Sequence, residues 1–416
     1  MGASSVFLAA NPSFAANQDE TFQAAATTDG EPLPDIERVL NLAKEAAPDV
    51  VSARMYVGVA NASYAGARLA PFDNPYLEVF TDRGRGGATR DLTVQANLWI
   101  PIEVSGQRAR RIAEVDALVA WQRANVESAK FAASGDAVRA YGMALVTASR
   151  VSVLEDIVSV ARAEAELYAA RLAGGDATLQ DERLASVELG RTTILLEESR
   201  ADMARALASL ARVTGRLFSV PTGTAVLPPP PTKRIDAASA ERLADSSAHV
   251  RAKAQEADYF ARARDRASVT SHAPVNVIVT AGRGDLGEAR FGGGLSWTFP
   301  ILRRNQGEQS RADAERTRAL AEADVQRRVL GAVLRGLDKE REEVRKALDV
   351  LDKLTDPAAH DAVEAAVATR AAGKGDTLRV LTARRDLAMV RLRKLDLVAR
   401  EWSIVADIVA LTGELP

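Results

Sequence analysis

The residues that most often carry chemistry are scarce and scattered in this chain. It has no cysteine, which excludes disulfides, thiolate metal sites and cysteine nucleophiles. The three histidines, His249, His272 and His360, lie far apart without His-x-x-x-His spacing, so we expect solvated or helix-surface side chains. The sequence also lacks a glycine-rich phosphate loop and a nucleophile elbow. It therefore predicts neither an enzyme nor a protein with a metal or organic cofactor.

The charged residues are plentiful but balanced. There are 54 Lys and Arg against 56 Asp and Glu, so no basic excess indicates a nucleic-acid partner, and we expect none. Most acidic residues lie in alanine-rich segments with helical periodicity, where they are typical of a solvated face. No run of 18 apolar residues occurs, so the sequence predicts no transmembrane helix.

The N-terminus, "MGASSVFLAANPSFAANQ", combines a short apolar segment with small residues, like the second half of a secretory signal. A basic start is missing, since the first Lys or Arg is Arg38. We interpret residues 1–16 as a truncated signal peptide and 17–34 as a disordered segment. A disordered tail over both ranges is the alternative.

An internal duplication organises the rest of the chain. Residues 75–102 match 274–301 without gaps at a constant offset of 199, which equates Thr81 with Thr280 and Pro101 with Pro300. We therefore expect a first repeat over 35–215 and a second over 237–416. The proline-rich stretch 216–236 between them predicts an extended linker.

Each repeat predicts the same order of elements. A helix (near 35–69, and 237–268) leads to two strands around a glycine-rich turn, then to a very long helix, a tip turn and a return helix. The second long helix should break at Pro357, because proline removes a helical hydrogen bond. The predicted ranges are strands at about 75–83, 91–101, 274–282 and 290–300, long helices at about 103–172 and 303–371, and tip turns at about 173–178 and 372–377.

The strands alternate between apolar and polar side chains. Such alternation suits either a sheet packed on a core or a transmembrane barrel with lipid outside and water inside. Since nearly everything else is helical rod, the strands have little core to cover, which favours the barrel. The residues expected to face lipid are Leu92, Val94, Leu98, Ile100, Leu295, Trp297 and Phe299.

Four strands cannot close a barrel, because an open edge in lipid would leave backbone groups unpaired. Three copies would supply twelve strands. Pro101 and Pro300 then mark the periplasmic edge, since proline is tolerated at a strand's end and in a helix's first turn.

The two strand-to-helix junctions, "IPIEVSGQRARRIAEV" and "FPILRRNQGEQSRADAE", resemble those of the TolC family of outer-membrane efflux channels, over about 35–414. The Arg-Asn-Gln-Gly of the second resembles the cobalt-zinc-cadmium (CzcC-type) branch. The junction residues that carry the resemblance are Pro101, Pro300, Asn305, Gln306 and Gly307.

The resemblance implies a mainly α fold with a small transmembrane β-barrel part, in which tandem-duplicated long helical hairpins and four strands per chain form a homotrimer. A twelve-stranded barrel in outer-membrane lipid would continue as an α-helical barrel through the periplasm of a Gram-negative bacterium. The partners implied are a periplasmic adaptor (membrane fusion) protein and an inner-membrane RND pump. Since the sequence has no cysteine, we expect that the chain is not one of the lipoprotein members.

The two turns after the long helices resemble the family's periplasmic tip, where the channel is constricted. Acidic residues there would ring the pore and attract cations, but helix capping alone would also explain the glycines, Thr178 and Asp376. The second turn is rich in Lys and Arg, so salt bridges or adaptor contact explain it equally well. The tip candidates are Gly174, Asp176, Asp181, Glu182, Gly373, Asp376 and Arg379.

The branch resemblance predicts heavy-metal cations as cargo, with drugs or other small molecules as the alternative. A periplasmic adaptor also has long helical hairpins, but it should have one hairpin flanked by globular β-domains. A coiled-coil scaffold should show strict heptads and no alternating strands.

Overall fold

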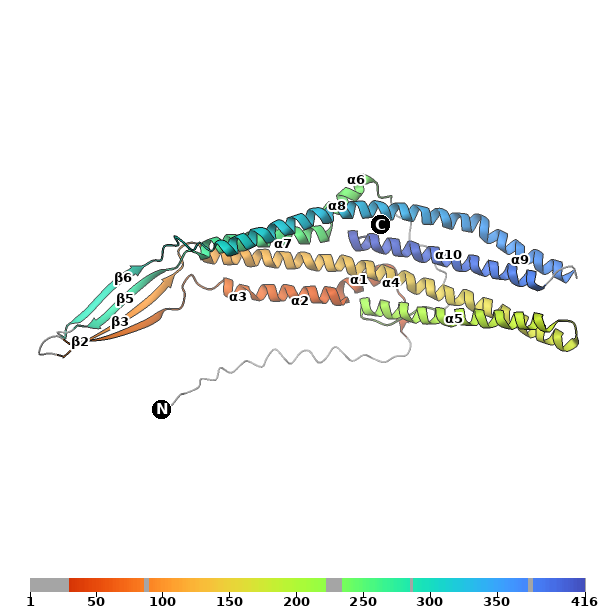
Figure 1. The fold of residues 1–416 in the computed structure, drawn as a ribbon, viewed down its shortest axis with the longest axis horizontal. Helices are drawn as coiled ribbons and strands as arrows, with labels where there is room; N and C mark the ends of the chain where they lie inside the picture. The colour runs from red at the N-terminus through yellow and green to blue at the C-terminus, as the bar shows by residue number, and fades with distance from the viewer. Residues whose placement is uncertain (1–29, 86–89, 222–233, 285–286, 373–376, 416) are drawn as a thin grey trace, which may run out of the picture.

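The computed structural model describes residues 30–85, 90–221, 234–284, 287–372 and 377–415. The molecule is elongated, with the strands at one end and two helical hairpins at the other (Figure 1). Both hairpins point the same way, so the C-terminal ends of α4 (Gln107–Gly174) and α9 (Asp356–Ala371) lie at the end opposite the strands. The predicted signal peptide and the disordered segment to residue 29 lie outside the described residues, as do 222–233 of the linker and 373–376 of the second tip turn.

The two repeats contain corresponding elements in the same order. The first comprises β1 (Glu31–Pro32), α1 (Ile36–Ala46), α2 (Pro48–Ala62), α3 (Tyr64–Ala67), β2 (Tyr76–Arg85), β3 (Arg90–Ile102), α4 (Gln107–Gly174), α5 (Leu179–Thr214) and β4 (Phe218–Ser219). The second comprises α6 (Ala237–Ser246), α7 (Ala248–Thr270), β5 (Val275–Arg283), β6 (Ala289–Ser296), α8 (Gln306–Val350), a π-helical turn (Leu351–Thr355), α9 (Asp356–Ala371) and α10 (Thr377–Thr412).

The helix expected near 35–69 is instead three helices, and that expected at 237–268 is two. Pro48 begins α2, and its ring forces the preceding Ala47 into an extended backbone with ψ of 133°. The second repeat turns at the same place without proline, because Ser247 takes nearly the same conformation, with ψ of 136°. Both repeats therefore have this turn whether or not a proline follows it. Pro48 is compatible with the turn but is not needed for it.

The two long helices differ near Pro357, as expected, but the second one is not broken there. α4 runs uninterrupted for 68 residues, about 100 Å at ~1.5 Å per residue. In the second repeat the helical path continues through residues 351–355, which form one π-helical turn just before Pro357. The wider turn accommodates a residue that has no N–H to donate, so the predicted break is a local widening.

The four long strands form one antiparallel sheet in the order β2-β3-β5-β6. β3 extends one residue further at each end than expected, to Arg90 and Ile102. β6 is shorter than the predicted 290–300, because it ends at Ser296. Among the described residues, β3 has a partner on both sides, whereas β6 pairs only with β5.

The gap-free match between the repeats is wrong over the first strand of each pair. Thr81 pairs with Val94, whereas Thr280 pairs with Asn97 and Gly292, so the two threonines lie on opposite faces of the sheet. The first hairpin has four residues between its last paired residues, and the second has five. The extra turn residue makes the offset 198 from β2 to β5 and 199 from β3 to β6, in agreement with the Gly-Arg-Gly at 84–86 and 282–284.

The largest buried core lies midway along the molecule, where α1 and the C-terminal half of α10 pack on α4. Close packing there depends on glycine, since a Cβ on Gly142 would lie 2.5 Å from Cγ of Trp402. Among the described residues, no helix has the length and apolar character needed to cross a membrane.

Candidate membrane sheet and helical tip

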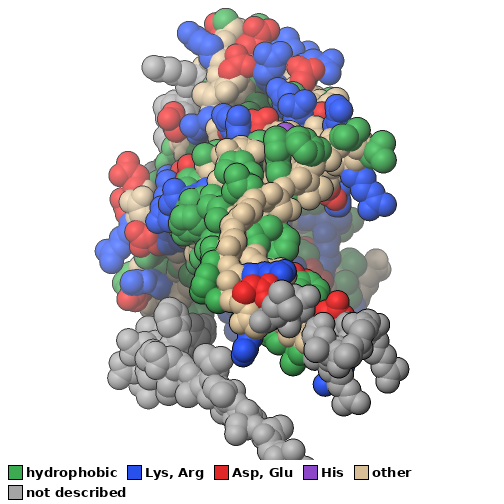
Figure 2. Space-filling model, turned by 90° about the vertical axis from the view of Figure 1, so that its left-hand side faces the viewer, with side chains coloured by type: hydrophobic (Ala, Val, Ile, Leu, Met, Phe, Trp, Pro, Cys, Tyr) green, Lys and Arg blue, Asp and Glu red, His purple; other side chains and the backbone are tan. Residues whose placement is uncertain are grey.

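One face of the four-stranded sheet is mainly apolar across all its strands, although Thr81, Arg83 and Arg283 also lie on it. Leu77 lies opposite Leu98, which lies opposite Val279, and directly paired residues point to the same side. These side chains are exposed, with 65% of Leu77 and 76% of Leu295 accessible. Viewed from the strand end, hydrophobic side chains gather over the sheet (Figure 2). The apolar face comprises Leu77, Val79, Leu92, Val94, Ala96, Leu98, Ile100, Val277, Val279, Ala281, Phe291 and Leu295.

The opposite face carries a hydrogen-bonded polar network, beside the side chains of Tyr76, Phe80 and Ile278. Oδ1 of Asn97 accepts from Nε2 of Gln95 at 2.9 Å and from the hydroxyl of Thr280 at 3.0 Å. Nε1 of Trp99 donates to Glu78 at 3.0 Å. These groups need water or each other, so the two faces suit different solvents.

The structure places five of the seven expected lipid-facing residues on the apolar face: Leu92, Val94, Leu98, Ile100 and Leu295. Trp297 and Phe299 follow the end of β6 and lie outside the described ladder. Their rings pack on each other with centroids 4.4 Å apart, and both remain exposed.

The two strand-to-helix junctions share the same backbone turn and the same glutamine hydrogen bond. Gly106 and Asn305 stand at equivalent positions in the left-handed conformation, with φ of 75° and 59°, which glycine and asparagine adopt at least cost. The next residue, Gln107 or Gln306, accepts from a backbone N–H two residues earlier, at 2.9 and 3.0 Å. Sequence reasoning missed Gly106, although its offset of 199 from Asn305 was a usable signal.

The remaining junction candidates are placed differently in the two repeats. Pro101 is buried within β3 and pairs with Asn276, whereas Pro300 lies beyond the end of β6. Gly307 is the second residue of α8, and open space surrounds the position of its absent Cβ. The proline of the first junction therefore lies within the hydrogen-bonded sheet, and that of the second lies beyond the end of its strand.

At the first tip, the left-handed residue is Gly175, with φ of 83°, and Gly174 is the last residue of α4. Thr178 and Asp181 form a capping box, in which the Asp181 carboxylate accepts from N–H of Thr178 at 3.1 Å. The hydrogen bonds from Thr178 lower the pKa of Asp181. Asp181 is thus engaged in capping α5.

The other tip candidates lie nearby. Asp176 is exposed, and Glu182 accepts from the Ser186 hydroxyl at 3.0 Å. Arg379 is exposed near the start of α10, while Gly373 and Asp376 lie outside the described residues.

A buried ion pair, absent from the predictions, joins the two hairpins above the tip. Glu164 of α4 is only 8% exposed and pairs with Arg384 of α10. Burial raises the pKa of Glu164, against the pull of Arg384 and Arg370. Arg370 also lies over the Tyr168 ring, 5.5 Å from its centroid. The spacing of Ala161, Glu164 and Tyr168 on one helical face was the available signal.

The histidines are not all simple surface residues. Nδ1 of His249 lies 2.6 Å from Oγ of Ser128, and its Nε2 donates to the carbonyl of Ala410 at 2.9 Å. His249 therefore joins α7 to α4 and α10. Within the described ranges, no group of three or more His, Asp or Glu is arranged to hold a metal ion.

The chain is similar in sequence to a known protein along most of its length. No family model matches it. It is 25% identical over 352 residues to the cobalt-zinc-cadmium resistance protein CzcC of Cupriavidus metallidurans, covering 83% of this chain and 82% of that protein.

Solved structures with a similar fold include outer-membrane channels. CmeC of Campylobacter jejuni has a TM-score of 0.74 at 13% identity, over 91% of this chain and 85% of its own. CusC has 0.71 at 12% identity, over 94% and 96%. VceC of Vibrio cholerae has 0.68 at 16% identity, over 91% and 97%.

CmeC and CusC are transmembrane channels and not enzymes. The resemblance inferred from the junctions is confirmed: the chain has the fold of the TolC-family outer-membrane efflux channels, and a cobalt-zinc-cadmium resistance protein is among its sequence relatives.

Proposed function

We propose that this chain is one subunit of a homotrimeric outer-membrane channel in a tripartite efflux system of a Gram-negative bacterium. The channel is a passive conduit that receives its cargo from an inner-membrane RND pump through a periplasmic adaptor. Energy then comes from the pump, so the chain needs no catalytic residue of its own.

The observation that carries this proposal is the sheet with one exposed apolar face. Buried against a protein core, that face would be covered, but here Leu77, Leu295 and their neighbours are open. Lipid is the solvent that fits such a face, and the polar network around Asn97 fits a water-filled lumen. From Leu92 to Ile102 the strand spans about 33 Å at ~3.3 Å per residue, enough for a tilted strand to cross a bilayer.

The helical hairpins fit a tunnel across the periplasm. The proposed barrel ends near Pro101 and Pro300, and α4 extends about 100 Å beyond it. At the far end, Asp176 and Glu182 supply negative charge near the tip, while Arg379 supplies positive charge. A mixed ring of this kind suits contact with an adaptor as well as selection of cations.

Sizing and conductance test the channel directly. Outer membranes are extracted with detergent, the protein is sized, and it is then inserted into planar bilayers. The proposal requires a trimer that conducts ions. A monomer that stays in the aqueous fraction and gives no conductance would overturn it.

We assign heavy-metal cations as the cargo because the curated relative is a cobalt-zinc-cadmium resistance protein. Deleting the gene should lower tolerance to cobalt, zinc and cadmium salts while leaving tolerance to hydrophobic drugs unchanged. The reverse pattern would assign drugs or other small molecules to the same channel.

Charge reversal separates pore lining from helix capping at the tip. Asp176→Lys should shift the reversal potential toward anions, because Asp176 is exposed at the turn. Asp181→Lys should shift it less, since that carboxylate is held by Thr178. Asp202→Lys, far along α5, is the matched control and should leave selectivity unchanged. Equal shifts in all three variants would rule out a specific role for the tip.

A further inference from the structure

The sheet face that we assign to the lumen carries one group of large side chains close to the helices. Tyr76 of β2 pairs with Trp99 of β3, and Trp99 pairs with Ile278 of β5, so the three side chains lie side by side on this face. The rings of Tyr76 and Trp99 are stacked, with centroids 5.5 Å apart and planes 8° from parallel. Tyr76, Trp99 and Ile278 therefore form an aromatic patch that spans three adjacent strands.

A carboxylate fixes the orientation of the indole in the aromatic patch. Nε1 of Trp99 donates to Oε2 of Glu78 at 3.0 Å. Glu78 lies two residues from Tyr76 on the same strand, so both side chains point to the same face. The indole is thus held from two sides, by a stacked ring and by a hydrogen bond.

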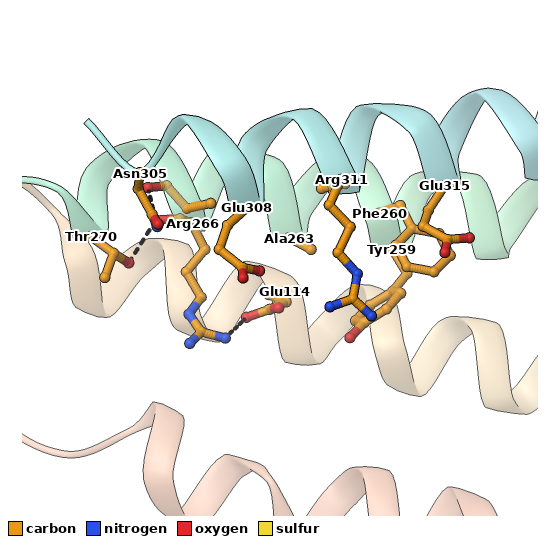
Figure 3. Close-up of a pocket in the computed structure, with 12 residues that line it drawn as sticks. Glu114, Tyr259, Phe260, Ala263, Arg266, Thr270, Asn305, Glu308, Arg311 and Glu315 are labelled. Atoms are coloured by element: carbon orange, nitrogen blue, oxygen red, sulfur yellow. Dashed lines mark hydrogen bonds and ion pairs between the residues drawn. The ribbon is translucent and has the colours of Figure 1, made fainter. Parts of the chain in front are cut away.

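The partner of Glu78 differs from that of a carboxylate on the nearby helices. A cleft of about 420 Å³ lies between α4, α7 and α8, and there Glu114 accepts from the guanidinium of Arg266 at 2.9 Å (Figure 3). Glu114 therefore joins two helices through an ion pair. Glu78 bonds to an uncharged indole N–H, so its contact serves to orient a ring.

The aromatic patch has no counterpart in the second repeat. With the offsets of 198 and 199, the positions equivalent to Tyr76 and Trp99 are Pro274 and Thr298. Neither residue is aromatic, although the two repeats have the same order of strands. The duplicated fold therefore does not require a stacked pair at this position, which indicates a separate role for it.

The size of the proposed barrel shows how far the aromatic patch narrows the lumen. Twelve strands ~4.8 Å apart and tilted by ~40° give a perimeter of about 75 Å and a backbone diameter of about 24 Å. Three copies related by three-fold symmetry place their patches at the same height. Large side chains that project from opposite walls take up about half of the backbone diameter. On the neighbouring strand β6, Gly292 and Gly294 face the lumen and add no side chain.

We propose that the aromatic patches of three copies form a collar inside the barrel, which limits the width of solutes that pass between the outside and the helical tunnel. This proposal rests on the proposed homotrimeric channel. Hydrated metal ions are narrow enough to pass such a collar, whereas wide rigid molecules are not. The collar therefore keeps wide solutes from entering the tunnel from outside. Glu78 is a positioning residue, because it acts through the indole of Trp99.

Cysteine labelling tests the collar, since the chain has no cysteine of its own. Thr93 and Asn276 lie on the lumen face on opposite sides of the collar. Thr93 pairs with Asp82 toward the strand turns, and Asn276 pairs with Pro101 toward the helices. Intact cells that carry Thr93→Cys or Asn276→Cys are treated from outside with a maleimide linked to β-cyclodextrin, a wide rigid ring. A small maleimide shows that each thiol can react, and mass spectrometry measures the labelling.

The small reagent should label both variants, and the wide reagent should label Thr93→Cys but not Asn276→Cys. Adding Trp99→Ala to Asn276→Cys should admit the wide reagent. Leu98→Ala is the matched control, because Leu98 lies on the apolar face of the same strand and should leave the exclusion unchanged.

Three results would overturn the collar. They are wide labelling of Asn276→Cys with the patch intact, continued exclusion after Trp99→Ala, and exclusion that already occurs at Thr93→Cys. The trimer size and conductance of the unmodified protein are measured separately. A conducting trimer would show that such a failure concerns the collar alone, and a monomer without conductance would overturn the proposed channel with it.

Two substitutions of Glu78 test its positioning role in the Asn276→Cys background. Glu78→Gln keeps an oxygen that can accept from Nε1 of Trp99, so the wide reagent should stay excluded. Glu78→Ala removes the acceptor, and the freed indole should let the wide reagent label Asn276→Cys. Exclusion in both variants would overturn the positioning role of Glu78, and entry in both would assign the effect to its charge instead of the hydrogen bond.

Discussion

At equivalent positions, the helices of the two hairpins are held together by different kinds of interaction. In the second, Glu401 of α10 is 1% exposed and pairs with Arg341 and Arg345 of α8, at 3.4 and 2.6 Å. In the first, the position equivalent to Glu401 is Met203 of α5, which packs on an apolar cluster that includes Ala144 and Ala148 of α4. The position equivalent to Arg341 is Gly142. The duplicated fold therefore accommodates either a buried ion cluster or apolar packing at this position. Substitutions in the two should reduce the stability of the protein by different amounts.

The largest expected effect is on the ion cluster. Glu401→Ala would leave the buried guanidinium of Arg341 without its carboxylate, and burial already lowers the pKa of Arg341. Breaking a buried pair on one side costs about 3–5 kcal/mol. Denaturant unfolding of the detergent-solubilised protein, followed by circular dichroism, measures the change.

A matched variant separates charge from packing. Replacing all three residues by apolar ones (Glu401→Met, Arg341→Leu and Arg345→Leu) makes the second hairpin resemble the first. It should be more stable than Glu401→Ala, because no charge is left buried alone. A triple variant as unstable as Glu401→Ala would show that lost volume, and not the unpaired charge, causes the effect.

A smaller loss is expected where the first hairpin packs closely against the second. In Gly142→Ala the new Cβ would lie 2.5 Å from Cγ of Trp402, so α4 and α10 must move apart. Overpacking of this kind costs about 1–3 kcal/mol. Gly336→Ala is the control, because its Cβ would enter open space on α8, and it should stabilise the protein by up to about 1 kcal/mol. A Gly142→Ala protein as stable as the control would show that the contact with Trp402 can relax.

Sequence reasoning succeeded where the signal is local. The period-two alternation of β3 gave its apolar face, and the absence of proline gave the uninterrupted α4. Sequence reasoning failed where the structure depends on which strands pair and in which register. The gap-free match of Thr81 with Thr280 concealed an extra turn residue that only the strand pairing reveals. The end of β6 at Ser296 likewise depends on which strands lie beside it.

The candidate site shows the same limit. A helical face containing Ala161, Glu164 and Tyr168 is visible in the sequence, but not which helix covers it. The ion pair of Glu164 with Arg384 links residues 220 positions apart, and it exists because α10 packs on α4. Capping of α5 by Thr178 was expected as one of two alternatives, and the structure adds Asp181 as the second residue of a capping box.

The smallest expected effect is on pH dependence near the tip, where the first repeat carries two carboxylates that the second lacks. The positions equivalent to Asp181 and Glu164 are Arg379 and Val363. Hydrogen bonds from Thr178 lower the pKa of Asp181 below 3.8, so its contribution to stability is present above pH 3.8 and lost as the pH falls through the lower folded value. Burial raises the pKa of Glu164 above 4.5, so its contribution is present below pH 4.5 and lost as the pH rises through the higher folded value.

Mild acid should therefore tighten the contact between the hairpins before stronger acid weakens the cap. Hydrogen exchange over the last turns of α4 and the first turn of α5 can follow the two steps separately. Glu164→Gln should abolish the gain in α4 protection as the pH falls toward 4.5, because the amide cannot titrate, while Asp181→Asn should abolish the loss at the start of α5 below 3.8. The second tip, with Arg379 and Val363 at these places, should show neither step, and a matching response there would mean that groups outside the first repeat govern both.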